Sequence, residues 1–191
     1  MKVKVTPSKV HGNVKTPASK SMAHRALICA SLSDGTSIVS NVTNSKDIEA
    51  TVGCMRALGA KIKQLDETTY EVTGTNLFKQ EGNITCNANE SGSTLRFLIP
   101  LAACTNAEVK FLGQGRLLQR PMDVYANEFK EQNIEFNQSD KEIIVSGNLQ
   151  AKNYVVQGDI SSQFITGFMF VLPLLKNDST LTITEPYESK S

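Results

Sequence analysis

The chain has 191 residues, of which 40% are hydrophobic and 20% are charged, and its formal net charge is +1. This is the composition of an ordinary globular protein, and a charge so close to zero argues against a broad surface for nucleic acid or anionic membranes. The strongest apolar run, residues 164–175, is too short to span a bilayer and contains Pro173. The N-terminal "MKVKVTPSKV" lacks the apolar core of a secretory signal. We therefore expect a cytoplasmic protein in which any cationic site is local.

The first predicted unit contains two helices, a strand and a hairpin. An apolar run after several serines predicts a helix from Lys20, and a short strand follows from Gly35. A second helix can be capped by Asn44 or Ser45. A β-hairpin is then expected over residues 60–74.

The second unit repeats this order. Its first helix begins at the serines of "SGSTLRFL", and its strand begins at Asn106. The segment "RPMDVYANEFKEQN" predicts the next helix, with Pro121 in the first turn. A hairpin over residues 134–147 completes the unit.

The third unit has a helix from Ser161 and a strand over residues 181–184, and no second helix or hairpin follows. The strand segments of the three units begin 71 and 72 residues apart, at Gly35, Asn106 and Asp178. We therefore expect an α/β fold of repeated helix–strand–helix–hairpin units, incomplete in the third, and hence part of a longer protein. Chance similarity of three short strands is the alternative.

The four cysteines are spread along the chain. They are Cys29, Cys54, Cys86 and Cys104, and no two of them form a CxxC pair. We expect small buried apolar side chains in a reducing compartment rather than disulfide partners or metal ligands.

Hydrogen-bond donors gather where the first helix of each unit begins. These donors are Lys20, Ser21 and Arg25, then Ser91, Gly92, Ser93 and Arg96, then Ser161, Ser162 and Gln163. A helix N-terminus already favours anions through its free N–H groups and its dipole. If symmetry relates the units, the three starts should converge on one concave face and form an anion site. Arg116 and Arg120 add two further cations.

Several of these residues also have purely structural explanations. A serine at a helix start is usually a cap, and Asp47 suits the first turn of its helix. His24 is better explained as solvent-facing or structural than as catalytic. Arg96 lies in an apolar run, where a buried arginine needs an anionic partner. Among these clusters only Glu90 and Asp159 could move a proton, and neither has a convincing partner, so we predict no catalytic residue and no metal ligand on this chain.

Five segments of the chain resemble motifs of the 5-enolpyruvylshikimate-3-phosphate (EPSP) synthase family. "PASKSMAHRALICASLSDG" resembles the family's "PGSKSxxxRALxxAALAxG", and "NESGSTLRFL" resembles its "NxGTxxRxL" loop for phosphoenolpyruvate. "GRLLQRPMDVY" is similar to its "RxxxRP" segment, and "GDISSQF" to its "SSQF" motif. The final "YESKS" looks like the start of its "SKPY" segment, so the resemblance runs from about Val3 to Ser191.

The resemblance implies a fold and an activity. The family has two similar domains, each of three helix–strand repeats around a pseudo-threefold axis. Residues 1–16 would belong to the other domain, and residues 17–191 to the substrate-binding domain. Family members transfer the enolpyruvyl group of phosphoenolpyruvate to the 5-hydroxyl of shikimate 3-phosphate and release phosphate, without a metal or organic cofactor. This is a step of the shikimate pathway to aromatic amino acids. The general acid and base lie in the family's other half, so we expect this chain to need that half for activity.

The resemblance also assigns residues. The positions that match shikimate 3-phosphate ligands are Lys20, Ser21, Arg25, Ser161, Ser162, Gln163 and Ser189. Those that match phosphoenolpyruvate ligands are Lys20, Gly92, Arg120 and Gln163, with Arg96, Arg116 and Asp47 in support. The chain departs from the family pattern at Ala18, which replaces a glycine, and at Glu90 and Ser91, where many members have Asn-Ala.

Two other functions remain open at this point. A related family transfers the same group to UDP-N-acetylglucosamine and usually carries a reactive cysteine where this chain has Gly115. The other alternative is a non-catalytic anion-binding module that retains the shikimate 3-phosphate half-site.

Overall fold

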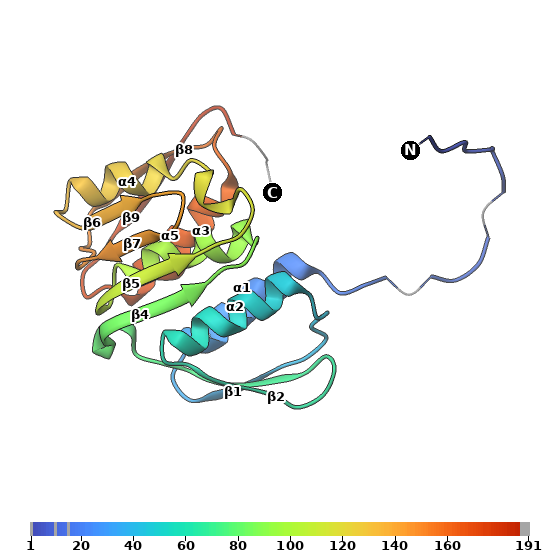
Figure 1. Ribbon diagram of the computed structural model, residues 1–191, viewed down its shortest axis with the longest axis horizontal. Helices are drawn as coiled ribbons and strands as arrows, with labels where there is room; N and C mark the ends of the chain where they lie inside the picture. The colour runs from blue at the N-terminus through green and yellow to red at the C-terminus, as the bar shows by residue number, and fades with distance from the viewer. Residues whose placement is uncertain (1, 10, 15, 188–191) are drawn as a thin grey trace.

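The computed structural model describes residues 2–9, 11–14 and 16–187, and it shows a mixed α/β body with a long N-terminal arm (Figure 1). The described residues of the arm, before Lys20, form no helix or strand, and nearly all are exposed. That this arm belongs to another domain stays a prediction. No helix in the described ranges combines the length and the apolar character needed to cross a membrane.

The first unit has the predicted order. Its elements are α1 (Lys20–Leu32), β1 (Thr36–Val39), α2 (Lys46–Ala57), β2 (Lys61–Gln64) and β3 (Tyr70–Thr73). The hydroxyl of Ser19 accepts from the N–H of Met22, and that of Ser45 from the N–H of Ile48, both at 3.3 Å. Serine caps therefore fix where both helices begin, and Ser45 rather than Asn44 caps α2. The strands form an antiparallel sheet in the order β1-β3-β2.

The second unit contains one strand that the sequence did not predict. Its elements are η1 (Leu77–Lys79), β4 (Glu81–Asn87), α3 (Gly92–Ala102), β5 (Asn106–Leu112), η2 (Leu117–Gln119), α4 (Asp123–Lys130), β6 (Glu135–Gln138) and β7 (Ile143–Ser146). The sheet order is β4-β5-β7-β6, and the unpredicted β4 is parallel to β5. The expectation for Pro121 was wrong, because α4 begins at Asp123 and leaves the proline outside the helix.

The third unit also has an extra parallel strand. Its elements are β8 (Asn153–Gln157), α5 (Ser162–Val171), η3 (Leu172–Leu174) and β9 (Thr180–Thr184). The unpredicted β8 pairs with β9 in a two-stranded parallel sheet. The predicted helix and strand are confirmed.

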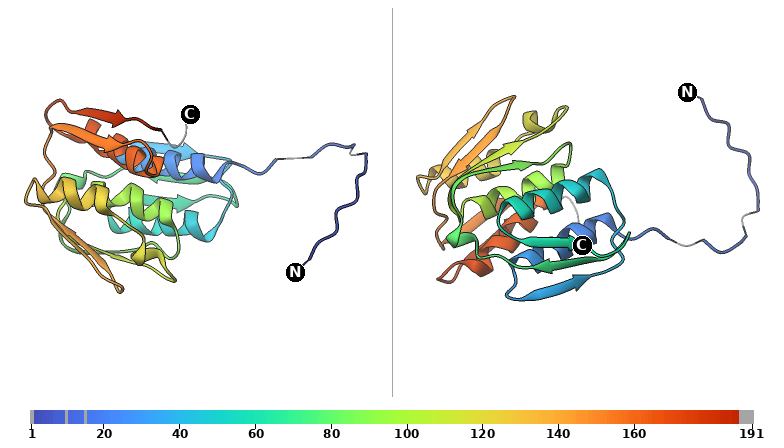
Figure 2. Two further views of the ribbon diagram at one scale, coloured as in Figure 1. Left: turned by 90° about the horizontal axis from the view of Figure 1, so that it is seen from above. Right: turned by 60° about the horizontal axis from the view of Figure 1, so that its bottom comes forward.

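Helix α3 lies at the centre of the body. Figures 1 and 2 show α1, α2, α3 and α5 side by side, with the strands around them. Every residue of α3 is buried except Ser93 and Arg96. A helix that is apolar on nearly every side belongs in a core rather than at a surface.

Tyr125 of α4 supplies a hydrogen bond that a proline removes from α3. Pro100 lies inside that helix and has no N–H to donate to the carbonyl of Arg96, four residues earlier. The Tyr125 hydroxyl donates to this carbonyl at 2.7 Å. Burial raises the pKa of Tyr125 well above its ordinary value, so the hydroxyl stays a donor. A Cβ on Gly167 of α5 would come within 2.8 Å of the same carbonyl, so α5 also packs closely here.

A buried polar link joins α1, α2 and α3. Nδ1 of His24 lies 2.7 Å from the hydroxyl of Thr51, which lies 2.7 Å from the hydroxyl of Thr94. All three side chains are buried. His24 is therefore structural, one of the two explanations expected, and it does not face solvent.

The expectation that the cysteines are buried is wrong for one of them. Cys54, Cys86 and Cys104 are buried, whereas Cys29 is exposed. Cys29 lies on the outer side of α1, next to the exposed Ala26. Burial raises the pKa of Cys104 to about 12, so this thiol stays protonated.

We expect Tyr125→Phe to lower the free energy of unfolding by about 1–3 kcal/mol, because the buried carbonyl of Arg96 loses its hydroxyl donor. Tyr187→Phe is a suitable control because Tyr187 is 43% exposed, and its effect should stay within about 0.5 kcal/mol. Urea unfolding measures both changes. Equal stability of the wild type and Tyr125→Phe would contradict this explanation of how α3 accommodates Pro100.

Stability should also depend on the protonation of His24. Burial lowers the pKa of His24 from 6.5 to about 4, while the Asp47 carboxylate opposes this shift and the charges of Lys20 and Arg25 reinforce it. The folded protein therefore holds the neutral ring, and protonation favours the unfolded chain. The contribution is fully present above pH 6.5 and is lost as the pH falls towards 4, by up to about 3 kcal/mol.

Urea unfolding at several pH values between 7.5 and 4 measures this dependence. His24→Asn is the comparison variant because its side chain does not titrate in this range. The free energy of unfolding should fall more steeply with decreasing pH in the wild type than in His24→Asn, and this difference gives the contribution of His24. Identical slopes would show that His24 does not cause the loss.

Candidate anion-binding site

Helices α1, α2, α3 and α5 begin at the same end of the body. Nζ of Lys20 in α1 lies 2.5 Å from a carboxylate oxygen of Asp47 in the first turn of α2. The carbonyl of Asp47 accepts a hydrogen bond of 3.3 Å from Thr94 in α3. The amide of Gln163 in α5 donates to Ser93 of α3 at 2.8 Å. These links bring together the three helix starts that the sequence marked as donor clusters.

Arg25 is held between α1 and α5 by neutral groups. Its guanidinium donates to the hydroxyl of Ser21 at 2.5 Å and to that of Thr166 at 3.1 Å. It also lies 5.2 Å from the centre of the Phe97 ring. Within the described residues no carboxylate forms an ion pair with it. The arginine is thus positioned by hydrogen bonds while its charge is available to an anion.

Gln163 joins the starts of α3 and α5. Its carbonyl oxygen accepts from Arg96 at 2.8 Å, and its amide donates to Ser93. The Arg96 guanidinium also lies 5.1 Å from the centre of the Phe164 ring. Gln163 is a neutral amide, so an anionic partner for Arg96 stays a prediction. Gln163 contacts both residues of α3 that are not buried.

The starts of α3 and α5 are capped by serines. The buried hydroxyl of Ser91 accepts from the N–H of Thr94, and that of Ser161 from the N–H of Gln163. Ser162 is exposed as the first residue of α5. The caps use these serines as acceptors, which leaves the hydroxyl protons available to other partners. Ser189 lies outside the described residues.

Gly92 is in close contact with Arg120. A Cβ on residue 92 would collide with Nη1 of Arg120. Arg120 also lines a hollow of about 340 Å³ with Arg116, Gln119 and Pro121. The structure therefore places a cation directly against the start of α3, and a side chain at position 92 would push this guanidinium aside.

The carboxylate of Glu90 lies against another glycine. Its Oε1 is 2.9 Å from the position that a Cβ on Gly115 would occupy. Glu90 lines a hollow of about 540 Å³ together with Lys46, Asp47, Glu49, Asn89 and Gln114. This hollow is mainly acidic, in contrast to the hollow beside Arg120.

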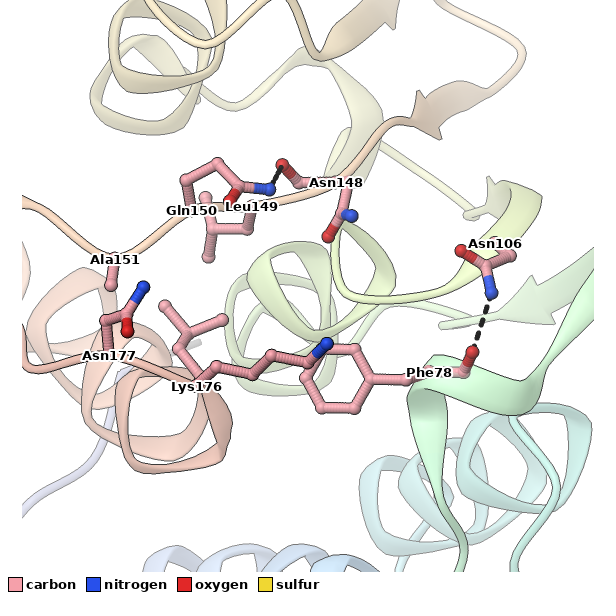
Figure 3. Close-up of a pocket in the computed structure, with 9 residues that line it drawn as sticks. Phe78, Asn106, Asn148, Leu149, Gln150, Ala151, Lys176 and Asn177 are labelled. Carbon is pink, nitrogen blue, oxygen red and sulfur yellow. Dashed lines mark hydrogen bonds between the residues drawn. The ribbon is translucent and has the colours of Figure 1, made fainter.

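A pocket of about 320 Å³ lies at the opposite end of the helices (Figure 3). Two of its lining residues show this position, because Asn106 lies beyond the C-terminal end of α3 and Leu175 lies beyond the C-terminal end of α5. Asn148, Gln150, Asn177 and Lys176 surround it, and Figure 3 shows the Lys176 side chain extending across it. Of the predicted site residues that the structure describes, none lines this pocket.

Sequence reasoning missed the residues that position these donors. Thr166 has no motif signal, because one threonine in an apolar helix is common. In the sequence, Phe97 and Phe164 have the pattern of core residues. The contacts of their rings with Arg25 and Arg96 depend on the tertiary fold. Across the described ranges, no three His, Cys, Asp or Glu side chains come close enough to hold a metal ion.

Comparisons with known proteins agree on a single family. The family model for EPSP synthase (3-phosphoshikimate 1-carboxyvinyltransferase) matches residues 5–190. A 3-phosphoshikimate 1-carboxyvinyltransferase of Clostridium perfringens is 47% identical over 99% of this chain, which covers 45% of that protein. One of Clostridioides difficile is 45% identical, with 98% and 45% covered.

The fold also matches solved structures. An EPSP synthase structure from Acinetobacter baumannii has a TM-score of 0.77 at 19% identity, over 92% of this chain and 41% of that one. A second structure from the same organism has a TM-score of 0.76. This chain spans about 45% of the length of the curated relatives it matches. The chain belongs to the EPSP synthase family.

Proposed function

We propose that the adjoining starts of α1, α3 and α5 form part of the substrate site of a 3-phosphoshikimate 1-carboxyvinyltransferase. One observation carries this proposal. The guanidinium of Arg25 is held by hydrogen bonds to Ser21 and Thr166, and it forms no ion pair among the described residues. It lies where two helix dipoles favour negative charge. Such a group suits the phosphate of shikimate 3-phosphate.

Each element of this site has a distinct task in the proposal. Lys20, Ser21 and Arg25 on α1 contact shikimate 3-phosphate from one side. The residues that contact it from α5 and beyond are Ser161, Ser162, Gln163 and Ser189. The N–H groups at Gly92 and the cation of Arg120 bind phosphoenolpyruvate, with Lys20 and Gln163 between the two substrates. Arg96, Arg116 and Asp47 act in support.

The reaction needs more than this half-site. Transfer of the enolpyruvyl group to the 5-hydroxyl requires an acid that protonates phosphoenolpyruvate and a base that accepts the hydroxyl proton. We infer that these groups lie in the part of the relatives that this chain does not match, and that the chain alone binds without turnover. We infer further that residues 1–16 belong to that other domain. The finer fold would be three repeats around a pseudo-threefold axis, and the location cytoplasmic.

The geometry disfavours transfer to UDP-N-acetylglucosamine. That function would need a reactive cysteine where this chain has Gly115. Gly115 has φ of +60°, and its α-carbon faces the carboxylate of Glu90. A cysteine there would be strained and would lie beside a negative charge that opposes a thiolate.

Arg25→Gln tests the site directly. We expect the affinity for shikimate 3-phosphate, measured by calorimetry, to fall about 10- to 100-fold, because one charged hydrogen-bond partner of the phosphate is lost. Glutamine keeps an amide that can still contact the neighbouring hydroxyls, so the fold should be retained.

Arg56→Gln is the matched control. Arg56 is also a helical arginine held by a neutral acceptor, the carbonyl of Ile62. It lies towards the end of α2, and its replacement should change the affinity less than about twofold. Equal affinities of the wild type and Arg25→Gln would refute the proposed role of Arg25.

A further inference from the structure

A continuous chain of buried hydrogen bonds runs through three helices to the start of α3. The three contacts, His24 to Thr51, Thr51 to Thr94 and Thr94 to Ser91, each measure 2.7 Å. The four side chains are at most 2% exposed. A buried chain of this kind contributes to stability only when its members are paired with one another.

The chain has a direction that follows from its acceptors. The Thr94 hydroxyl has one proton, and its neighbours include the hydroxyl of Ser91 at 2.7 Å and the carbonyl of Asp47 at 3.3 Å. Thr94 is the donor in both contacts, so its single hydroxyl proton points towards Ser91 and Asp47 and not towards Thr51. Thr51 must then donate to Thr94, and Nδ1–H of His24 must donate to Thr51.

The other nitrogen of His24 supports the same direction. Nε2 is buried and has no hydrogen-bond partner among the described residues. In the opposite arrangement a proton on Nε2 would be a buried donor without an acceptor, which folded proteins rarely contain. The ring is therefore the neutral tautomer with its proton on Nδ1.

The two ends of this chain lie beside the proposed ligands. His24 is adjacent to Arg25 and one helical turn from Lys20, while Ser91 precedes Gly92. The carboxylate of Asp47 binds Lys20, and its carbonyl accepts from Thr94. A shift of α1 against α2 and α3 would break the chain and move both cations.

We propose that His24, Thr51 and Thr94 are positioning residues that hold Lys20 and Arg25 in place for shikimate 3-phosphate. This inference rests on the proposed function of the site. The three residues do not touch the ligand themselves, and they act by fixing α1 against its two neighbours.

Two substitutions of Thr51 separate the hydroxyl from its packing. Thr51→Val keeps the shape and removes the hydroxyl, whereas Thr51→Ser keeps the hydroxyl and removes a methyl group. If Thr51 acts by packing alone, Thr51→Ser should bind shikimate 3-phosphate more weakly than Thr51→Val. A positioning role through the hydrogen-bond chain predicts the reverse.

Nuclear magnetic resonance of the ligand-free chain tests the hydrogen-bond chain. Long-range ¹⁵N spectra should show His24 protonated on Nδ1 in the wild type and in Thr51→Ser. In Thr51→Val, Nδ1–H loses its acceptor, so neither ring nitrogen has a partner, and the spectra should show a mixture of the two tautomers. A wild-type ring protonated on Nε2 would overturn the directed chain.

Calorimetry with shikimate 3-phosphate tests the positioning role. We expect about tenfold weaker binding by Thr51→Val, and binding by Thr51→Ser within about twofold of the wild type. Equal binding by the wild type and Thr51→Val, or equal weakening in both variants, would overturn this inference and leave the proposed function standing. Absence of binding by the wild type would instead overturn the proposed function, and the positioning role with it.

Discussion

Helix α3 is buried along almost its whole length, so each polar group on it needs a partner inside the protein. The carbonyl of Arg96, left without an N–H by Pro100, accepts from Tyr125 of α4. The hydroxyl of Thr94 is bound from α2, and Ser93 is bound from α5. These partners come from α4, α2 and α5. The hydrogen bonds that the polar groups of α3 need therefore determine how these three helices pack around it. The alignment of the helix starts at one end of the body is a consequence.

Much of the fold could be predicted from local pattern. Serine caps, apolar spacing and turn residues identified helices α1 to α5 and the hairpins β2-β3 and β6-β7. The parallel strands β4 and β8 were missed for different reasons. "EGNITCN" contains a glycine and two asparagines, which disfavour strands, so β4 depends on pairing with β5 along its whole length. "NYVVQ" is a short run of aromatic and β-branched residues, which favour strands, and that signal was available in the sequence; in the structure Tyr154 and Val156 are buried.

The sequence predicted which residues form the candidate site, but not the hydrogen bonds that hold them in place. Donors at helix starts can be recognised because free N–H groups and caps are local properties. The bond from Arg25 to Thr166 joins residues 141 positions apart, and no local pattern predicts it. The same is true of Gln163, which was assigned by resemblance and is found to join α3 to α5. Cys29 was misjudged because an apolar run does not reveal which side of a helix faces solvent.

The central claim is that this chain carries a shikimate 3-phosphate half-site without the groups for catalysis. The most direct measurement is calorimetric titration with shikimate 3-phosphate, followed by a phosphate-release assay on the same sample after addition of phosphoenolpyruvate. We predict saturable binding at or below millimolar ligand and no phosphate release above the blank. Absence of binding at millimolar ligand, or phosphate release at an ordinary enzymatic rate, would contradict the claim.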